Sequence, residues 1–405
     1  MQRQILKFSE GFLWGAGTSA HQTEGNNTSS DWWAWENSFK RAEGLRAKGL
    51  DPEDFKSGIT CDSYNRYDED FALAKELGHN ATRLSIEWAR IEPREGYFDE
   101  KAMEHYEKVL QSAKFHGLKT FVTLHHFTNP LWFSRLGAFE KKENVKYFVR
   151  YAEVAAKRLN EYVDFWLTVN EPEIYTAMGY LTGVFPPQKR SIFSAVKAVN
   201  NIILAHNLSA PKIRFFGNKP VSMAFHLSDL LPANIFTGII ASLIHYIANE
   251  YILRKTIAAC DYIGVNYYYH HHIGLFGWRR KSHSNHNADD LGSGIHPEGL
   301  GRVLLNLRKF KKPIYITENG LADARDLKRE KFIKDHLFYL HRAIEKGADI
   351  RGYLHWSLID NFEWEKGFMP RFGLIEIDRE DLLKRRVRYS AIKYAEICRS
   401  NTLKY

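Results

Sequence analysis

Short apolar or β-branched runs alternate with longer amphipathic stretches along the whole chain of 405 residues. The runs recur about every 48 residues, which leaves room for one strand, two loops and one helix. Strands that alternate with helices predict a parallel sheet, because parallel neighbours need a long crossover between them. Eight such units in one chain favour a closed barrel over an open sheet. The runs are Phe12–Ala20, Ala81–Trp88, Lys119–His126, Phe165–Glu171, Lys219–His226, Asp261–Tyr268, Pro313–Gly320 and Ile350–Leu358.

The stretches between the runs carry the helical period. Asp68–Leu77, Val145–Asn160 and Arg329–Gly347 each repeat apolar residues at three- and four-residue spacing, and Gly347 stands where a helix commonly stops. The chain is 44% apolar and 26% charged, which is typical of a globular protein with a large core. We therefore expect residues 1–405 to form a single α/β domain, a (β/α)8 TIM barrel.

Two of the runs end in a glutamate where a barrel has its active site. The fourth run closes in the letters TVNEP, which contain Glu171, and the seventh closes in ITENG, which contain Glu318. These strands are three apart around an eight-fold ring, so their C-terminal side chains can face each other across the mouth. Two facing carboxylates are the minimum apparatus for cleaving a glycosidic bond, one as proton donor and the other as nucleophile or base.

Polar and aromatic residues close the other runs or follow them. Sugars need flat apolar faces for stacking and polar groups for their hydroxyls, so this mixture suits a pyranose ring. The residues concerned are Gln22, Arg83, His126, Asn266, Tyr267, Tyr268, Trp356, Glu363 and Trp364.

Seven motifs in order along the chain resemble those of glycoside hydrolase family 1, the family of retaining β-glucosidases and β-galactosidases. The resemblance covers nearly the whole chain, and its last block is the most specific. The motifs are FLWGAGTSAHQTEG, RLSIEWARIEP, TLHHFTNP, LTVNEP, GVNYY, YITENG and RGYLHWSLIDNFEWEKGFMPRFGL.

The resemblance implies a role for each matching residue. Glu171 is similar to the acid/base of the family, and Glu318 is similar to its nucleophile. Arg83 and Tyr268 resemble the residues that hydrogen-bond the nucleophile and keep it ionised. Trp356 matches the stacking platform of the −1 subsite, and Phe372 lies near the O6 side of the sugar. The other positions that match residues holding this sugar are Gln22, His126, Asn170, Glu363 and Trp364.

These roles imply double-displacement hydrolysis of small β-glycosides, with glucoside expected first and galactoside or fucoside also accepted. The two carboxyl groups should lie roughly 5–5.5 Å apart. A nearby cation and donor are expected to lower the pKa of Glu318, whereas the pKa of Glu171 should be raised.

Charge and histidine pattern argue against other partners. The net charge of +9 is spread along the chain, so no nucleic-acid partner is expected. His270, His271, His272, His283 and His286 match no ligand spacing, and we expect no metal and no cofactor. The three cysteines favour reduced thiols and a cytoplasmic protein.

Two alternative functions remain open at this stage. One is a 6-phospho-β-glycosidase on the same fold, against which Glu363 and Trp364 argue because a carboxylate would repel phosphate. The other is a sugar-binding barrel without turnover, against which the presence of both glutamates argues.

Three features depart from the family pattern. Phe127 and Thr128 stand where the family usually has tryptophan and aspartate, which puts one sugar contact in question. Glu87 replaces a common serine and is interpreted as structural, paired with a nearby arginine such as Arg90. The segment 205–260 is much shorter than the family norm, so we expect a shortened fifth strand-helix region.

That segment contains 20 uncharged residues, 230–249. Their number reaches the length of a membrane span, but polar residues and Pro232 interrupt them, and the stretch lies inside the barrel sequence. We expect the fifth barrel helix here, buried on an apolar stripe. Its opposite face is expected to meet a second subunit, a lipid surface or an apolar ligand. The stripe is Ile235, Phe236, Ile239, Ile240, Leu243, Ile244 and Ile247, and the opposite face is Thr237, Gly238, Ala241, Ser242 and Ala248.

Overall fold

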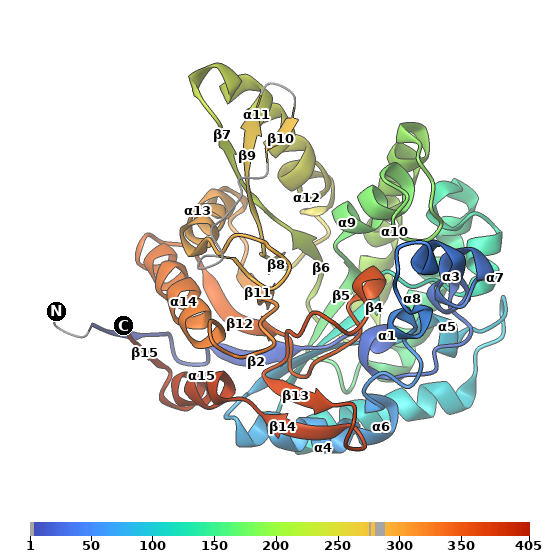
Figure 1. The fold of residues 1–405 in the computed structure, drawn as a ribbon, viewed down its shortest axis with the longest axis horizontal. Helices are drawn as coiled ribbons and strands as arrows, with labels where there is room; N and C mark the ends of the chain where they lie inside the picture. The colour runs from blue at the N-terminus through green and yellow to red at the C-terminus, as the bar shows by residue number, and fades with distance from the viewer. Residues whose placement is uncertain (1–3, 275–276, 280–287) are drawn as a thin grey trace.

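The computed structural model describes residues 4–274, 277–279 and 288–405, and its centre is a closed barrel of eight parallel strands (Figure 1). Each predicted run contains one barrel strand, in chain order around the ring, so the barrel prediction is confirmed. The strands are β2 (Leu13–Gly17), β3 (Ala81–Ser85), β4 (Lys119–His125), β5 (Phe165–Asn170), β6 (Val221–His226), β8 (Ile263–Asn266), β11 (Ile314–Asn319) and β12 (Ile350–Trp356).

Helices surround the barrel, as the helical periods predict. The predicted helix 145–160 is present as α8, and α14 ends two residues before Gly347, whose φ of +87° lies in the left-handed region that favours glycine. The outer helices are α4 (Ser63–Glu76), α6 (Glu100–Phe115), α8 (Val145–Leu159), α10 (Ile192–Phe215), α12 (Tyr251–Thr256), α13 (Pro297–Leu307), α14 (Arg329–Glu345) and α15 (Tyr389–Ser400).

Shorter elements complete the rim and the ends of the chain. Strand β1 (Ile5–Lys7) pairs antiparallel with β15 (Thr402–Lys404), so the two ends of the described chain lie side by side. Strands β13 (Ile375–Asp378) and β14 (Lys384–Val387) form a separate hairpin. The short helices are α1 (Ala20–Thr23), α2 (Asp31–Glu36), α3 (Phe39–Arg46), α5 (Trp88–Ile91), α7 (Leu131–Arg135), α9 (Pro172–Thr176) and α11 (Gly238–His245).

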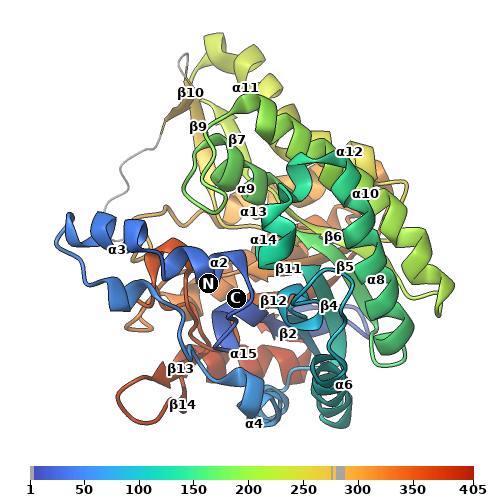
Figure 2. The same cartoon turned by 90° about the vertical axis from the view of Figure 1, so that its right-hand side faces the viewer.

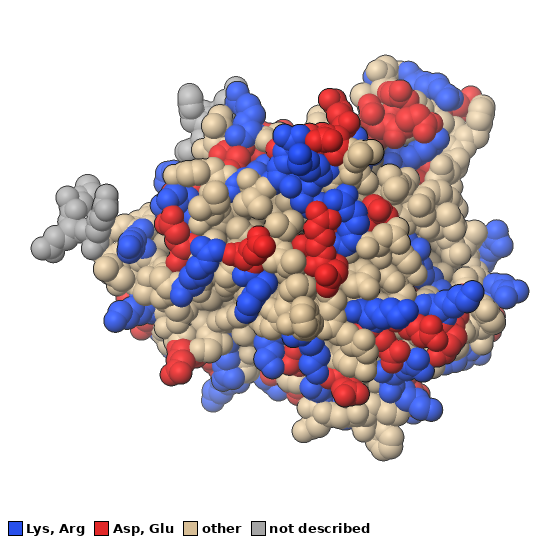
Figure 3. Space-filling view, turned by 90° about the horizontal axis from the view of Figure 1, so that it is seen from below, with Lys and Arg blue, Asp and Glu red and all other residues tan. Residues whose placement is uncertain are grey.

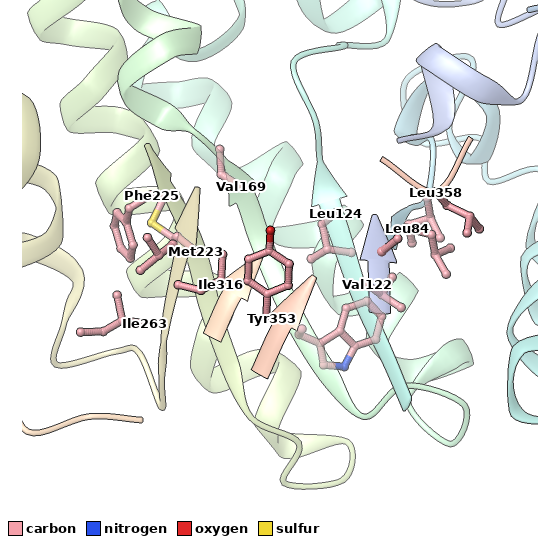
Figure 4. Close-up of a cluster of buried hydrophobic side chains, with 14 of the residues drawn as sticks. Leu84, Val122, Leu124, Val169, Met223, Phe225, Ile263, Ile316, Tyr353 and Leu358 are labelled. Atoms are coloured by element: carbon pink, nitrogen blue, oxygen red, sulfur yellow. The ribbon is translucent and has the colours of Figure 1, made fainter. Parts of the chain in front are cut away.

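The barrel strands are buried on both faces, which is why they read as continuous apolar runs. On the outer face, residues two apart along each strand pack into the layer between sheet and helices, since strand side chains alternate. Figure 4 shows this layer, with Val122 and Leu124 from β4 and Met223 and Phe225 from β6.

Four aromatic rings fill the inside of the barrel at its N-terminal end. We call this set the aromatic floor: Phe121, Phe165, Tyr262 and Tyr315. Every pair among the four is in ring contact, with centroid distances from 4.3 Å to 6.2 Å. Thr123 follows Phe121 by two residues on the same strand, so polar groups begin one layer above the floor.

The fifth strand-helix unit is complete but differs from the expectation. Strand β6 pairs with both β5 and β8, so the shortened region does not open the barrel. Beyond it, β7 (Asp229–Pro232), β9 (His270–Gly274) and β10 (Gly277–Arg279) form a three-stranded ribbon that rises past the ends of the barrel strands (Figure 1).

The uncharged stretch 230–249 is not one helix, which corrects the sequence-based prediction. It begins in β7, and a helical segment starts only after Asn234, whose side chain accepts a hydrogen bond from the Phe236 amide at 3.1 Å. Helix α11 then continues through a π turn into α12, and α12 is the part that packs beside the barrel helix α10. Within the described residues, no helix is both long and apolar enough to cross a membrane.

The buried and exposed faces of α11 also differ from the prediction. Ala241 and its neighbours Ile240, Ile244 and Ala248 pack against the ribbon, because a small residue lets the helix approach the strands closely. The other half of the predicted buried stripe is exposed to solvent. Its exposed fractions are 83% for Phe236, 87% for Ile239, 59% for Leu243 and 60% for Ile247.

The aromatic floor gives a test of the barrel core. Phe121→Ala removes a fully buried ring that contacts three others, and we expect it to lower the free energy of unfolding by about 3–5 kcal/mol. Phe115→Ala is the matched control, because Phe115 on α6 is 85% exposed and its loss should cost no more than about 0.5 kcal/mol. Urea titration followed by circular dichroism measures both. Equal midpoints for the two variants would contradict the assigned role of the floor.

Candidate active site

Glu318 lies near the end of β11, with its carboxylate held by two donors. Arg83 forms an ion pair and hydrogen bond with Oε1 of Glu318, and the Tyr268 hydroxyl donates to Oε2 at 2.7 Å. Glu318 is only 4% exposed. The two residues predicted to support this glutamate therefore both contact it.

Arg83 is a fully buried guanidinium that connects several barrel strands. Its Nη2 donates to Oδ1 of Asn170 at 2.7 Å, and its Nε donates to Thr123 Oγ1 at 3.2 Å. Its partners come from β4, β5 and β11, while Arg83 itself lies on β3. One cation thus fixes the positions of side chains from three other strands.

Glu171 is the first residue after β5 and stands in a strained conformation. Its φ of +42° lies in the left-handed region, which a residue with a Cβ adopts at an energetic cost. Pro172 follows and starts α9, so the chain turns sharply at this position. Asn266 donates to Glu171 Oε1 at 2.9 Å, and His226 Nδ1 lies 3.2 Å from the same oxygen.

His226 is a contact residue that the sequence analysis did not select. It closes β6, and the rule that selected the other residues, a polar side chain at the end of a barrel strand, applies to it equally. Its backbone amide donates to the Glu173 carboxylate at 3.3 Å, and Nε2 lies 3.4 Å from Ser228 Oγ. His226 is therefore held on three sides beside the Glu171 carboxylate.

The pKa values of the two glutamates are shifted in the opposite sense to the prediction. Burial raises the pKa of Glu318 to about 7, against the opposing charge of Arg83 and with a further increase from the charge of Glu171. Burial also acts to raise the pKa of Glu171, but His226, Asn266 and Arg83 outweigh it and hold that pKa below its ordinary value. For Glu171 the difference traces to His226, whose charge the sequence analysis did not include, and for Glu318 it traces to burial, which outweighs Arg83.

The pKa of His226 moves in the matching direction. Burial lowers it, but the negative charge of Glu171 and then of Glu173 and Glu318 outweighs burial, so the pKa lies above its ordinary value. His226 and Glu171 therefore each favour the charged form of the other across their 3.2 Å contact.

Gln22 and Glu363 lie together at one side of the site. Gln22 is fully buried, and its side-chain amide donates to the Phe362 carbonyl at 2.9 Å, to Asn361 at 3.0 Å and to Glu363 Oε2 at 3.3 Å. Ser19 fixes the other end of the amide by donating to Gln22 Oε1 at 2.7 Å. The loop after β12 is thereby bound to the loop after β2.

Three flat rings form one side of the site. His126 stacks on Trp356 and on Trp364, each with a centroid distance of 5.9 Å. His126 Nε2 also lies 3.1 Å from the side-chain nitrogen of Asn170. Phe372 packs with Trp356 and meets Tyr268 edge-on. Direct contacts thus place the predicted sugar-binding residues in one continuous group around Glu171 and Glu318.

Two residues that depart from the family pattern, Glu87 and Thr128, contact each other through hydrogen bonds. Glu87 accepts hydrogen bonds from the Thr128 hydroxyl at 2.9 Å and 3.1 Å, and Arg90 pairs with Glu24 at 2.9 Å. The prediction that Glu87 pairs with Arg90 is therefore wrong. Phe127 packs against Trp364, with centroids 5.1 Å apart, and so backs the aromatic side of the site.

The described part of the chain contains no group of three His, Cys, Asp or Glu residues arranged for a metal ion. His270 packs against His296, with tilted rings whose centroids are 4.2 Å apart. His283 and His286, which the sequence analysis considered as metal ligands, lie outside the described residues.

Both the sequence and the fold of this chain match known proteins. The sequence matches the family described as "Glycosyl hydrolase family 1" over residues 4–237 and 248–403. It is 29% identical to "Beta-glucosidase A" of Thermotoga maritima, covering 98% of this chain and 99% of that protein. It is also 29% identical to "Beta-galactosidase" of Pyrococcus woesei, covering 92% and 93%. The solved "beta-glycosidase from Pyrococcus horikoshii" superimposes with a TM-score of 0.90 at 36% identity, covering 99% and 97%.

The His226–Glu171 contact predicts a change in pH dependence. His226 lowers the pKa of Glu171, so His226→Gln should raise that pKa. If Glu171 acts as a base in the second half of the reaction, the acid limb of kcat for dinitrophenyl β-glucoside should move to higher pH. The measurement is the kcat profile against pH, with His116→Gln at the far end of the barrel as the matched control. An unchanged acid limb in His226→Gln would show that His226 does not tune this carboxyl.

Proposed function

The chain belongs to glycosyl hydrolase family 1, and we propose that it hydrolyses small β-D-glycosides with Glu318 as nucleophile and Glu171 as acid/base. The observation that carries the proposal is the separate support given to each carboxylate. Arg83 and Tyr268 hold Glu318, whereas His226 and Asn266 hold Glu171. Two carboxyl groups in different environments are what a double displacement requires.

In the first step, ionised Glu318 attacks the anomeric carbon and Glu171 gives a proton to the aglycone oxygen. The bond from carbon to that oxygen breaks, and a glycosyl ester with Glu318 forms. His226 Nδ1 lies 3.2 Å from Glu171 Oε1 and is placed to pass this proton to it. Tyr268 and Arg83 bind one oxygen each of the Glu318 carboxylate, so its orientation is fixed before the sugar binds.

In the second step, water enters at the position that the aglycone has left. Glu171 is now ionised and takes a proton from this water, whose oxygen attacks the anomeric carbon and releases Glu318. His226 favours this ionised form through its contact at 3.2 Å. Two inversions at the same carbon give a product with retained configuration.

The side chains around the carboxylates support recognition of one terminal pyranose. Asn170 is fixed by Arg83 and Asn266, at 2.7 Å and 3.0 Å from its Oδ1, and its position suits the 2-hydroxyl. Gln22 and Glu363 supply polar groups for other hydroxyls, and the Trp356 ring supplies an apolar face for the sugar. We expect glucosides first, with galactosides and fucosides also accepted.

A phosphorylated sugar fits this site less well. Burial, together with the negative charges of Glu365, Glu318 and Glu171, raises the pKa of Glu363 to about 8. Surroundings that disfavour the ionised form of Glu363 in this way also disfavour a phosphate dianion at the same place. The buried cation Arg83 is already committed to Glu318 and Asn170.

The nucleophile assignment is tested with Glu318→Gln. We expect kcat for an aryl β-glucoside to fall by more than about a thousand-fold, because an amide cannot form the glycosyl ester. Nitrophenol release measures the rate, and a panel of aryl glucoside, galactoside, fucoside and phosphoglucoside ranks the sugars for the wild-type protein. Glu345→Gln, on the exposed face of α14, is the matched control and should keep full activity. Substantial residual turnover in Glu318→Gln, free of contaminating glycosidase, contradicts the assignment.

The acid/base assignment has a different signature in Glu171→Ala. Dinitrophenol needs little protonation to leave, so we expect the first step to survive while the second step slows. Azide needs no base and should restore turnover, giving a β-glycosyl azide that is detected by mass spectrometry and NMR. If azide neither raises the rate nor appears in a product, Glu171 does not have this role.

A further inference from the structure

Helix α1 carries two successive side chains that contact the loop after β12. Gln22 donates to the Glu363 carboxylate and to the backbone of that loop. The preceding residue, His21, stacks on Trp364, with ring planes 6° apart and centroids 5.7 Å apart. One turn of helix thus holds both the polar residue and the aromatic residue of the loop.

The His21 ring is the first of four rings that stack in a row. Trp364 stacks on His21 and on His126, and His126 stacks in turn on Trp356. We call this set the ring row: His21, Trp364, His126 and Trp356. Each of the four side chains is at most 5% exposed, so a shift of the first ring is passed on to the others through close packing.

Two side chains fix the orientation of the His21 ring. The Asn27 amide donates to Nδ1 at 3.2 Å, so Nδ1 is the acceptor and the ring proton is on Nε2. This Nε2 faces Oε2 of Glu36 at 3.5 Å. Both atoms are buried, and neither has a hydrogen-bond partner elsewhere. His21 Nε2 and Glu36 Oε2 therefore depend on each other.

Glu36 is a costly residue at this position. On the face shown in Figure 3, acidic and basic side chains lie intermixed at the surface, where solvent hydrates them. Glu36 is instead 1% exposed, and it forms no ion pair with a Lys or Arg in the part of the chain that the structure describes. Its other partner is the Ser57 hydroxyl, which donates to Oε1. Burial of a carboxylate without a cationic partner is unfavourable, so packing alone does not explain a glutamate here.

The segment that carries Glu36 is also attached to the loop after β12. Glu36 is the last residue of α2, and α2 and α3 lie beside this loop (Figure 2). Arg41 of α3 donates to the Glu365 carbonyl at 3.0 Å. A change at Glu36 is therefore felt first at Trp364 and its neighbours.

We propose that Glu36 is a positioning residue for the sugar. Its carboxylate holds the His21 imidazole, and through the ring row it sets the Trp364 and Trp356 rings against which the sugar binds. The inference rests on the proposed function, because it takes these two tryptophans as sugar-binding residues. Glu36 does not touch the substrate. It supplies a hydrogen-bond acceptor that fixes the aromatic side of the site before the sugar binds.

The test compares two substitutions of Glu36. Leucine fills a similar volume but accepts no hydrogen bond, whereas the glutamine amide can accept from His21 and donate to the Ser57 oxygen. We expect kcat/KM for an aryl β-glucoside to fall about ten-fold in Glu36→Leu and to stay within about two-fold of wild type in Glu36→Gln. Glu43→Leu, at an exposed position on α3, is the matched control and should have wild-type activity.

A double-mutant cycle with Trp364 separates positioning from a general loss of stability. In a Trp364→Ala background, Glu36→Leu should lower kcat/KM for dinitrophenyl β-glucoside by less than about two-fold, because the ring through which it acts is absent. A general loss of stability would instead lower kcat/KM by the same factor in both backgrounds, which would contradict the proposal.

The double variant His21→Phe with Glu36→Leu serves if Glu36→Leu does not fold. It replaces both polar partners by apolar side chains, which costs less stability than removal of one partner. Its thermal midpoint should stay near that of the wild type while its kcat/KM stays about ten-fold lower. Wild-type kcat/KM in either variant, a Glu36→Gln variant as impaired as Glu36→Leu, or failure of both variants to fold would overturn the proposal.

Calorimetric titration with glucose tests the same inference without turnover. Glucose should bind about ten-fold more weakly to Glu36→Leu than to the wild-type protein, and equal affinities would overturn the positioning role. Loss of turnover in Glu318→Gln together with unchanged glucose affinity and kcat/KM in Glu36→Leu would remove this inference alone. Absence of turnover in the wild-type protein would remove the proposed function and leave the glucose titration to decide on Glu36.

Discussion

The burial of one guanidinium, that of Arg83, constrains the rest of the site. A charge without solvent contact is tolerated only when its neighbours replace the lost hydration. Glu318, Asn170 and Thr123 do this from three other strands, so the same contacts that satisfy Arg83 also fix the carboxylate and the sugar-binding amide. The barrel must close in its observed order for these side chains to meet, which makes the geometry of the site a property of the whole ring.

This arrangement leaves Glu171 without a strong cation of its own, and His226 fills that position. Burial raises the pKa of Glu173 and of Glu363 to about 8 each, so the charges in the pocket are limited to those that have a partner. Arg83 serves Glu318, and His226 serves Glu171. A histidine differs from an arginine here because it can release its proton, and so the acid/base is paired with a group that can itself give and take a proton.

The sequence predicted the parts of the structure that depend on local pattern or on position within the barrel. Eight apolar runs located the eight strands, and the strand-end rule found Glu171 and Glu318. The pKa direction of Glu171 was wrong because His226 acts on it from 55 positions away, at the end of the neighbouring strand. That of Glu318 was wrong because its burial outweighs the charge of Arg83. The buried face of α11 was predicted only in part, for a similar reason. Only the ribbon of β7 and β9 determines which side of that helix is covered, and Ala241 fits against it better than a larger side chain does.

The aromatic floor determines the route by which substrate, alcohol and water reach the active site. Phe121, Phe165, Tyr262 and Tyr315 fill the barrel below the polar layer, so small molecules reach the anomeric carbon only from the mouth. The departing alcohol and the incoming water must therefore pass through the same opening at the mouth of the barrel, one after the other. Any alcohol or sugar that lingers there competes with water for the glycosyl ester. The loops around the mouth of the barrel can bind an alcohol or sugar acceptor. How strongly they do so determines whether the glycosyl group is transferred to water or to another hydroxyl.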